Sequence, residues 1–296
     1  VTLVEHDRYG LEKVSSSSAP VVANAFEDNG RVYATAIFYP GAIVATKPDE
    51  ASHDYVPEFN SETDVVQITT TVEFESATLT SYTQYREEGG THHEDFDVSS
   101  LPVFHFNFDT TDEIFTQEFL LASTQQGRLQ WTTGLFYLAD DNEFQNNKAS
   151  FGGAPFARLG GSGTETRSIS AFGDLSYELR EDLFLTGGLR YSYDEVNNSY
   201  CLDANLDPVN VADIDNSELT PRVVLRYKPS EASSVYASYA QGYKAGILNV
   251  GGGTLDDVEV EPEKIQAYEL GYKYSAGSLA LDMATYYYDY QDLQIA

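Results

Sequence analysis

The sequence predicts an all-β protein, organised as one antiparallel sheet whose strands run up and down in chain order. Three observations predict this fold class. Apolar and polar residues alternate along eleven stretches of strand length, five short connections of two to four residues join some of them, and five connections of 21 to 27 residues join the others. Side chains of a strand point to opposite faces in turn, and short turns join antiparallel neighbours.

The strands are expected, in order, at 31–39, 64–74, 77–87, 113–123, 128–139, 167–179, 183–195, 219–228, 233–243, 265–274 and 279–290. Short turns are expected at 75–76, 124–127, 180–182, 229–232 and 275–278, and long loops at 40–63, 88–112, 140–166, 196–218 and 244–264. Strands of up to 13 residues suit a tilted membrane crossing. Five long loops are uncommon in a compact soluble domain.

The two faces of this sheet differ in polarity. Along 183–195, Leu185 and Leu189 alternate with Arg190 and Asp194. The apolar, convex face is expected to carry Leu183, Leu185, Leu189, Ile169, Leu175, Val223 and Leu225. The polar, concave face is expected to carry Asp174, Glu178, Arg190, Asp194, Arg222 and Arg226. One lipid-facing and one polar face predict a transmembrane β-barrel, with tight periplasmic turns and large extracellular loops.

Aromatic residues support the membrane interpretation. Trp131 and Tyr177 fall near the turn ends of their strands, and Tyr137, Tyr191 and Tyr193 near the loop ends. Two aromatic girdles at the membrane interfaces would produce this placement. The alternative is that tyrosine simply favours strand ends. The single Cys201 forms no internal disulfide.

Acidic residues dominate the charge. The formal net charge is -30, which argues against nucleic acid as a partner. The five long loops hold 25 Asp and Glu residues against 5 Lys and Arg residues. They form either a solvated surface or a set of carboxylates that share divalent cations with lipopolysaccharide phosphates. In both cases an acidic mouth disfavours strongly anionic ligands.

Several segments carry a family resemblance. In order they are Leu219–Pro229 (LTPRVVLRYKP), Val235–Gly246 (VYASYAQGYKAG), Tyr268–Lys273 (YELGYK) and Tyr286–Gln294 (YYYDYQDLQ). The ordered set resembles the β-barrel of TonB-dependent outer-membrane receptors, over about residues 62–296. That barrel has 22 strands, so the resemblance implies an open, curved sheet of about half a barrel. Residues 1–296 are then a partial barrel domain, without the plug domain, the TonB box and the closing C-terminal strands.

The resemblance implies a receptor and transporter in the bacterial outer membrane that is energised through TonB. Its commonest ligand is a ferric siderophore; cobalamin, haem and oligosaccharides are the alternatives. The implied partners are outer-membrane lipid and lipopolysaccharide, TonB, the plug and a small-molecule ligand, with a monomeric barrel and no cofactor. An outer-membrane enzyme would need an aligned nucleophile and base, which the sequence does not show. A secreted β-sandwich adhesin would show shorter strands.

Candidate binding residues lie in two of the long loops, 88–112 and 244–264, together with the adjoining upper lumen. They are His92, His93, Glu94, Asp95, His105, Tyr243, Lys244 and Asn249, and none is expected to be catalytic. The run from Thr91 to Asp95, with Asp97 and His105, could hold a transition metal or be an ordinary polar loop tip. The alternating Phe104, Phe106 and Phe108 could stack on an aromatic or sugar ligand, or form a small strand that packs on the loop itself. The polar-face residues Asp174, Glu178, Arg190, Asp194, Arg222 and Arg226 could contact a plug or pair within the lumen.

Overall fold

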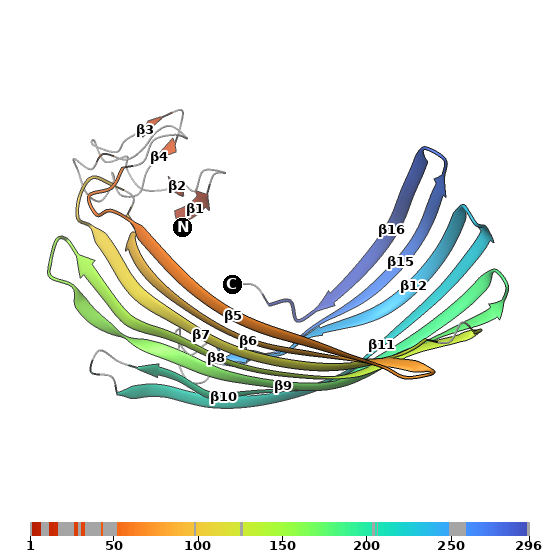
Figure 1. The fold of residues 1–296 in the computed structure, drawn as a ribbon. Helices are drawn as coiled ribbons and strands as arrows, with labels where there is room; N and C mark the ends of the chain where they lie inside the picture. Colours follow the sequence, from red (N-terminus) through yellow and green to blue (C-terminus); the bar gives the residue numbers. More distant parts are fainter. Residues whose placement is uncertain are drawn as a thin grey trace.

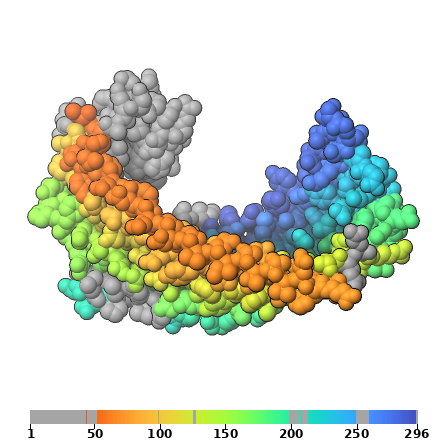
Figure 2. All heavy atoms as spheres, in the orientation of Figure 1, coloured from red at the N-terminus to blue at the C-terminus, as the bar shows by residue number. Residues whose placement is uncertain are grey.

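A computed structural model describes residues 2–6, 12–16, 27–28, 31–32, 43, 52–97, 99–124, 127–202, 205, 207–248 and 259–294. In this part of the chain, ten strands form one antiparallel sheet in the order β16-β15-β12-β11-β10-β9-β8-β7-β6-β5. Figure 1 shows the sheet as a deep curve with β5 and β16 at its two edges. The space-filling view shows a shell that is hollow on one side (Figure 2).

The ten strands of the sheet are β5 (Glu58–Glu73), β6 (Ala77–Asp95), β7 (Phe104–Ser123), β8 (Leu129–Phe151), β9 (Ala157–Arg180), β10 (Leu183–Leu202), β11 (Pro208–Ser230), β12 (Ser233–Lys244), β15 (Glu263–Ala276) and β16 (Leu279–Gln291). Three short hairpins accompany them: β1 (Thr2–His6) with β2 (Glu12–Ser16), β3 (Glu27–Asp28) with β4 (Arg31–Val32), and β13 (Ile247–Leu248) with β14 (Glu259–Val260). None of the described residues forms a helix long and apolar enough to cross a membrane.

Neighbours in the sheet follow chain order, which confirms the up-and-down antiparallel fold and excludes a Greek-key sandwich for these strands. The five short turns also lie where they are predicted. At the β15–β16 turn, Gly277 has a φ of 60°, a left-handed conformation that glycine adopts at little cost. Of the predicted first strand, 31–39, only Arg31–Val32 is described, and it pairs with Glu27–Asp28 instead of with the ten-stranded sheet. Residues 33–39 lie outside the described residues.

The predicted long loops are largely wrong. β6 and β7 continue until only 96–103 separates them, β8 and β9 are separated by 152–156, and β10 and β11 by 203–207. The strands of these hairpins therefore have 19 to 24 residues. The amphipathic pattern marks only the part of a strand with lipid on one side, because above the membrane both faces meet water. Backbone pairing continues there without the pattern.

The register confirms that the sheet has one apolar and one polar face. Cross-strand partners lie on the same face of a sheet. One row joins Leu175, Gly187 and Val223, and the adjacent row joins Asp174, Gly188 and Arg222. All of Leu183, Leu185, Leu189, Ile169, Leu175, Val223 and Leu225 fall on the first face, and Arg190, Asp194, Arg226 and Glu178 share the second with Asp174 and Arg222.

Glycine positions indicate which face is concave. On the polar face, a Cβ added to Gly134 would lie 2.4 Å from the Phe172 ring, and one added to Gly271 would lie 2.3 Å from Tyr236. On the apolar face, a Cβ added to Gly187 would have no heavy atom within 4 Å. Side chains converge inside a curved sheet and diverge outside it. The crowding therefore supports a concave polar face, as the sequence predicts.

Apolar side chains of the described residues point outward instead of forming a core. Only Ala77, Ala149 and Val196 are buried hydrophobic residues, whereas Leu175 is 58% exposed. Outward positions of β9 are apolar from Ile169 to Leu179. Those ten steps span ~33 Å along the strand, or ~25 Å at a tilt of ~40°, the height of a lipid-facing band. We call this zone the lipid band.

A row of carboxylates marks the upper edge of the lipid band. Asp64, Glu87, Glu113, Asp141 and Glu165 are cross-strand partners on five consecutive strands, β5 to β9. They occupy the face that is apolar farther down. Like charges opposite one another repel. The Arg167 guanidinium offsets this repulsion at Asp141 and Glu165, at 2.8 and 3.4 Å, and the rest of the row needs water or cations around it. The sheet therefore leaves the hydrocarbon region at this level.

Candidate functional site

Aromatic rings form a strip on the polar face above the lipid band. The register aligns Phe59 of β5, His92 of β6 and Phe108 of β7 in one row. The ring centroids of Phe59 and His92 are 4.6 Å apart, and those of His92 and Phe108 are 4.2 Å apart and nearly parallel, at 11°. Phe144 of β8 follows at 4.5 Å from Phe108. These separations are within the range of attractive ring contacts.

The strip continues toward the tips of β7 and β8. Phe106 lies 5.4 Å from Phe108, and Phe104 stacks on Phe151 with centroids 4.8 Å apart at 6°. Phe59 and Phe151, at its two ends, remain 65% and 60% exposed. We define the aromatic strip as Phe59, His92, Phe104, Phe106, Phe108, Phe144 and Phe151. It is a surface of ring faces open to a ligand at both ends.

Strand periodicity explains the strip. Phe104, Phe106 and Phe108 alternate along β7, so their rings lie on one face of the strand. They do not form a separate small strand in a loop, which was one of the two sequence interpretations. The contributions of Phe59, Phe144 and Phe151 were not predicted, because their register with β7 depends on long-range pairing. The alternation of Phe104, Phe106 and Phe108 was the only local signal.

The candidate metal-binding run divides between the two faces. His92 and Glu94 lie on the face of the strip, where His92 Nδ1 is 3.8 Å from a carboxylate oxygen of Glu94. His93 lies on the opposite face, with Nδ1 3.5 Å from Glu58 Oε2. The five adjacent residues therefore cannot act as one ligand set, because neighbours on a strand point apart.

Asp95, Asp97 and His105 of the predicted set do converge, and the structure adds Asp54 to them. One potential ligand atom from each of the four residues lies within 4.8 Å of the others. Asp54 is more than 40 residues from Asp95 in the chain, so no local pattern could reveal it. The cluster lies where residues 52–57 pass over the β6–β7 tip.

The remaining predicted binding residues belong to another part of the sheet. Tyr243 and Lys244 end β12, and five strands separate β12 from β6 in the sheet order. Asn249 lies outside the described residues. Near Tyr243, Gln241 Nε2 donates to Glu218 Oε1 at 3.0 Å, and Lys264 Nζ lies 2.5 Å from Glu218 Oε2. This network is not brought together with the aromatic strip.

The polar-face residues form pairs and cation–π contacts within the sheet. Arg222 Nη2 donates to Asp174 Oδ1 at 2.7 Å. The Arg190 guanidinium lies 5.5 Å from the ring centroid of Phe172. The Arg226 guanidinium lies 4.9 Å from that of Phe184. The contacts restrain long cationic side chains against the concave surface and keep their charge available.

The Asp140 carboxyl group lies just above the lipid band on the polar face and has a raised pKa. Partial burial raises its pKa, and the nearby Asp112 and Asp141 carboxylates raise the pKa further. Its Oδ1 atom is buried without a hydrogen-bond partner. The charged form of Asp140 is therefore disfavoured in the folded sheet.

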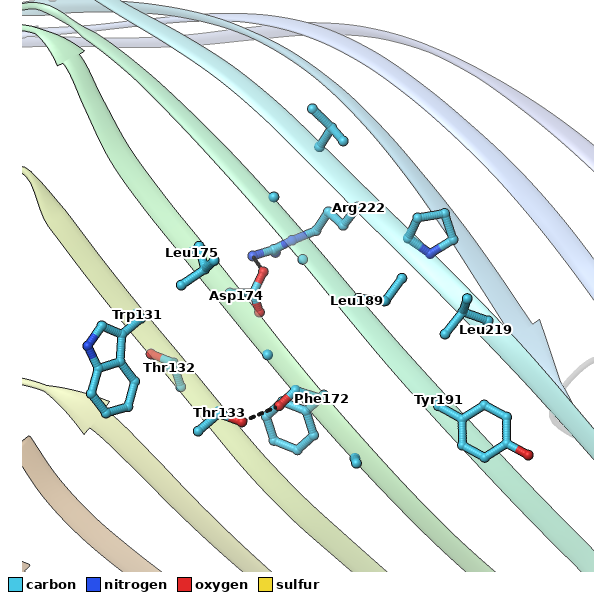
Figure 3. Close-up of a pocket in the computed structure, with 16 residues that line it drawn as sticks. Trp131, Thr132, Thr133, Phe172, Asp174, Leu175, Leu189, Tyr191, Leu219 and Arg222 are labelled. Carbon is cyan, nitrogen blue, oxygen red and sulfur yellow. Dashed lines mark hydrogen bonds and ion pairs between the residues drawn. The ribbon is translucent and has the colours of Figure 1, made fainter.

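A shallow hollow of about 810 Å³ lies on the apolar face over β8 to β11. Trp131, Leu175 and Leu189 line it, and Figure 3 shows Asp174 of β9 and Arg222 of β11 joined across β10. Gly187 leaves part of the hollow open, since an added Cβ there would have no heavy atom within 4 Å. Because this face meets hydrocarbon, we assign no soluble ligand to the hollow.

Sequence comparison gives a family match and distant relatives. Residues 10–296 match the family model described as TonB dependent receptor-like, beta-barrel. The pesticin receptor of Yersinia pestis is 28% identical over 134 residues, covering 45% of this chain and 20% of that receptor. The rhizobactin receptor of Rhizobium meliloti (strain 1021) is 23% identical over 169 residues, covering 46% and 23%. The matched segments thus span less than a quarter of either relative.

Solved structures share the fold. The ferric yersiniabactin uptake receptor FyuA of Yersinia pestis aligns with a TM-score of 0.72 and 18% identity, over 81% of this chain and 37% of that chain. The ferric preacinetobactin receptor BauA of Acinetobacter baumannii aligns with a TM-score of 0.57 and 17% identity, over 78% and 37%. At these identities the similarity shows the fold alone.

Proposed function

Because the chain belongs to the TonB-dependent receptor-like β-barrel family of the outer membrane, we propose that it forms part of a receptor for the uptake of a ferric siderophore. In this proposal the rest of the receptor supplies a plug, a TonB-binding segment and the remaining strands. The relatives support this ligand class, since their names are those of a pesticin, a rhizobactin and a ferric yersiniabactin receptor. Transport makes and breaks no covalent bond, and no residue is proposed to be catalytic.

The aromatic strip is the observation that carries the proposal. It lies above the lipid band on the face that we propose lines the lumen, so a ligand from outside meets it early. Exposed rings bind other ring systems by stacking and apolar contact, and each ring pair contributes about 0.5–1.5 kcal/mol. We therefore propose that the strip captures a ferric chelate whose chelator carries aromatic rings.

Charge narrows the ligand class further. The chain carries a formal net charge of -30, and Glu94 of β6 and Asp112 of β7 lie on the same face as the strip. Carboxylates in a concave site repel an anionic ligand within about 8 Å. A neutral or weakly charged ferric complex fits this surface better than a polyanionic one. The acidic loops predicted from the sequence also disfavour a strongly anionic ligand.

The concave polar face is proposed to contact the plug. The pairs and cation–π contacts of Arg190, Arg222 and Arg226 hold charged groups on the side that a plug would occupy. The opposite face is proposed to contact lipid, with the row from Asp64 to Glu165 at the level of the lipopolysaccharide head groups. Divalent cations would offset the repulsion between these carboxylates and lipopolysaccharide phosphates.

Equilibrium binding to the purified full-length receptor tests the proposal. The probes are a ferric phenolate siderophore, which carries rings, and a ferric hydroxamate siderophore, which carries none. Phe59→Ala and Phe151→Ala each remove an exposed ring of the strip and should weaken phenolate binding by about 2- to 12-fold. Phe119→Ala, which removes an exposed ring on the apolar face, is the matched control.

The possible outcomes distinguish failure of the strip as the ligand site from failure of the proposed receptor function. Weaker phenolate binding by the two strip variants, with Phe119→Ala unchanged, supports capture by the strip. Unchanged binding by both strip variants would remove the strip from the ligand site. Failure of the receptor to bind any ferric siderophore would contradict the proposed function itself.

A further inference from the structure

One buried imidazole and three carboxylates converge on the side of β7 opposite the aromatic strip. His105 lies between Phe104 and Phe106 in the chain, so its side chain points away from those rings. Its side chain is only 8% exposed, and its Nε2 lies 2.9 Å from Asp54 Oδ1. Asp95, the cross-strand partner of His105, and Asp97 complete the group.

The imidazole is fixed in orientation by its surroundings. The Tyr55 ring stacks on His105 with centroids 4.8 Å apart at 22°, and Phe156 lies on the same side of the strand, 6.4 Å from the His105 ring. These rings hold the imidazole plane while Nε2 points toward the carboxylates. An ordinary acidic loop has no such buried nitrogen donor, so the group differs in kind from a solvated cluster of aspartates.

Two of the carboxylates are also oriented by hydrogen bonds. The Ser99 hydroxyl donates to Asp97 Oδ1 at 2.5 Å, and the Phe104 backbone N–H donates to Asp97 Oδ2 at 2.7 Å. The Asp54 backbone N–H donates to Asp95 Oδ2 at 3.2 Å. Outer hydrogen bonds of this kind orient the ligands of protein metal sites.

We propose that Asp54, Asp95, Asp97 and His105 bind a divalent transition-metal cation of the size of Zn²⁺. Ligand bonds of ~2.1 Å place the ligand atoms of a tetrahedral site ~3.4 Å apart. The four ligand atoms lie within 4.8 Å of one another, so none needs to move by more than roughly 0.8 Å toward a common centre to close the site. Imidazole favours a transition metal over Ca²⁺, and the carboxylates supply the opposing charge.

The position of the bound cation between two segments of the chain indicates a structural role. It joins residues 52–57 to the β6–β7 tip, directly behind the strand that carries Phe104, Phe106 and Phe108. Three carboxylates held this close repel one another, and the cation offsets that repulsion. The metal therefore rigidifies the base of the aromatic strip. This inference goes beyond the proposed uptake function and does not depend on it.

Zn²⁺ titration of the full-length receptor, purified in detergent and freed of metal with a chelator, tests the site. His105→Gln and Asp54→Asn should each weaken the tightest Zn²⁺ binding by at least ~10-fold. The matched controls are His93→Gln on β6 and Asp109→Asn on β7, which change the same residue types outside the cluster. Both controls should stay within ~2-fold of the unsubstituted receptor.

Hydrogen exchange gives a readout that is independent of affinity. Zn²⁺ should slow exchange in 52–57 and 96–105 of the unsubstituted receptor, and not in Asp54→Asn, whose residue lies outside the sheet. Heat-modifiable gel mobility checks that each variant is folded. Equal Zn²⁺ binding by His105→Gln, Asp54→Asn and the unsubstituted receptor would overturn the proposal. So would displacement of Zn²⁺ by Ca²⁺ at equal concentration, because that preference excludes an imidazole ligand.

Discussion

A lysine at Leu175 should strongly destabilise the receptor in lipid, whereas a lysine at the next residue should cost much less. Leu175 is 58% exposed on the apolar face of β9, close to the middle of the outward positions from Ile169 to Leu179. A Lys at the bilayer midplane costs about 2–4 kcal/mol. Loss of the leucine side chain from lipid adds about 1–2 kcal/mol. Leu175→Lys should therefore lower the unfolding free energy by about 3–6 kcal/mol.

Ser176→Lys is the matched control, because Ser176 points to the polar face in register with Thr186. It loses the hydrogen bond from the Thr186 hydroxyl to Ser176 Oγ, and its cost should be about 1 kcal/mol. The assay is reversible urea unfolding of the full-length receptor in lipid vesicles, followed by tryptophan fluorescence. Equal costs at the two positions, or a larger cost at Ser176, would refute the assignment of the faces.

Two further predictions concern the polar face. Asp140→Asn should raise the unfolding free energy at pH 7, because a raised folded-state pKa makes the charged Asp140 unfavourable in the folded sheet. The gain should vanish by about pH 3, well below the pKa of about 3.9 of an unfolded aspartate, because Asp140 is then protonated in both states. Urea unfolding at pH 7 and at about pH 3 measures the gain, and destabilisation at pH 7 would contradict this. Gly134→Ala places a Cβ 2.7 Å from the Phe119 carbonyl oxygen and should cost about 1–3 kcal/mol. Gly187→Ala has open space and should be neutral or stabilising by up to about 1 kcal/mol, so equal thermal stability of these two variants would contradict the assigned crowding.

The lipid-spanning part of the fold was predictable because lipid imposes a pattern on it. Leu185 and Leu189 face hydrocarbon and Arg190 faces the other way, so the period of two reports both the strand and its register. Above the lipid band this constraint ends. Residues such as Asp109 and Asn142 face water on both faces of the sheet, so the upper parts of their strands lack the alternating pattern. The sequence therefore predicts loops there.

The binding surfaces could be predicted only in part. Phe104, Phe106 and Phe108 share a face through local periodicity, and the sequence shows this directly. The partnership of Phe108 with Phe59 depends on pairing across three strands, and that of His105 with Asp54 on a connection more than 50 residues long. Local patterns carry no information about such pairings. The sequence therefore identified some members of each cluster and missed the partners that complete it.

Uptake of radioactive iron by intact cells tests the central claim most directly. Cells that express the full-length receptor receive a panel of iron-55-labelled siderophores, in paired strains with and without TonB. The account predicts that iron from a ring-bearing siderophore accumulates only when both the receptor and TonB are present. Accumulation at the same rate without TonB, or no receptor-dependent accumulation of iron from any siderophore of the panel, would contradict it.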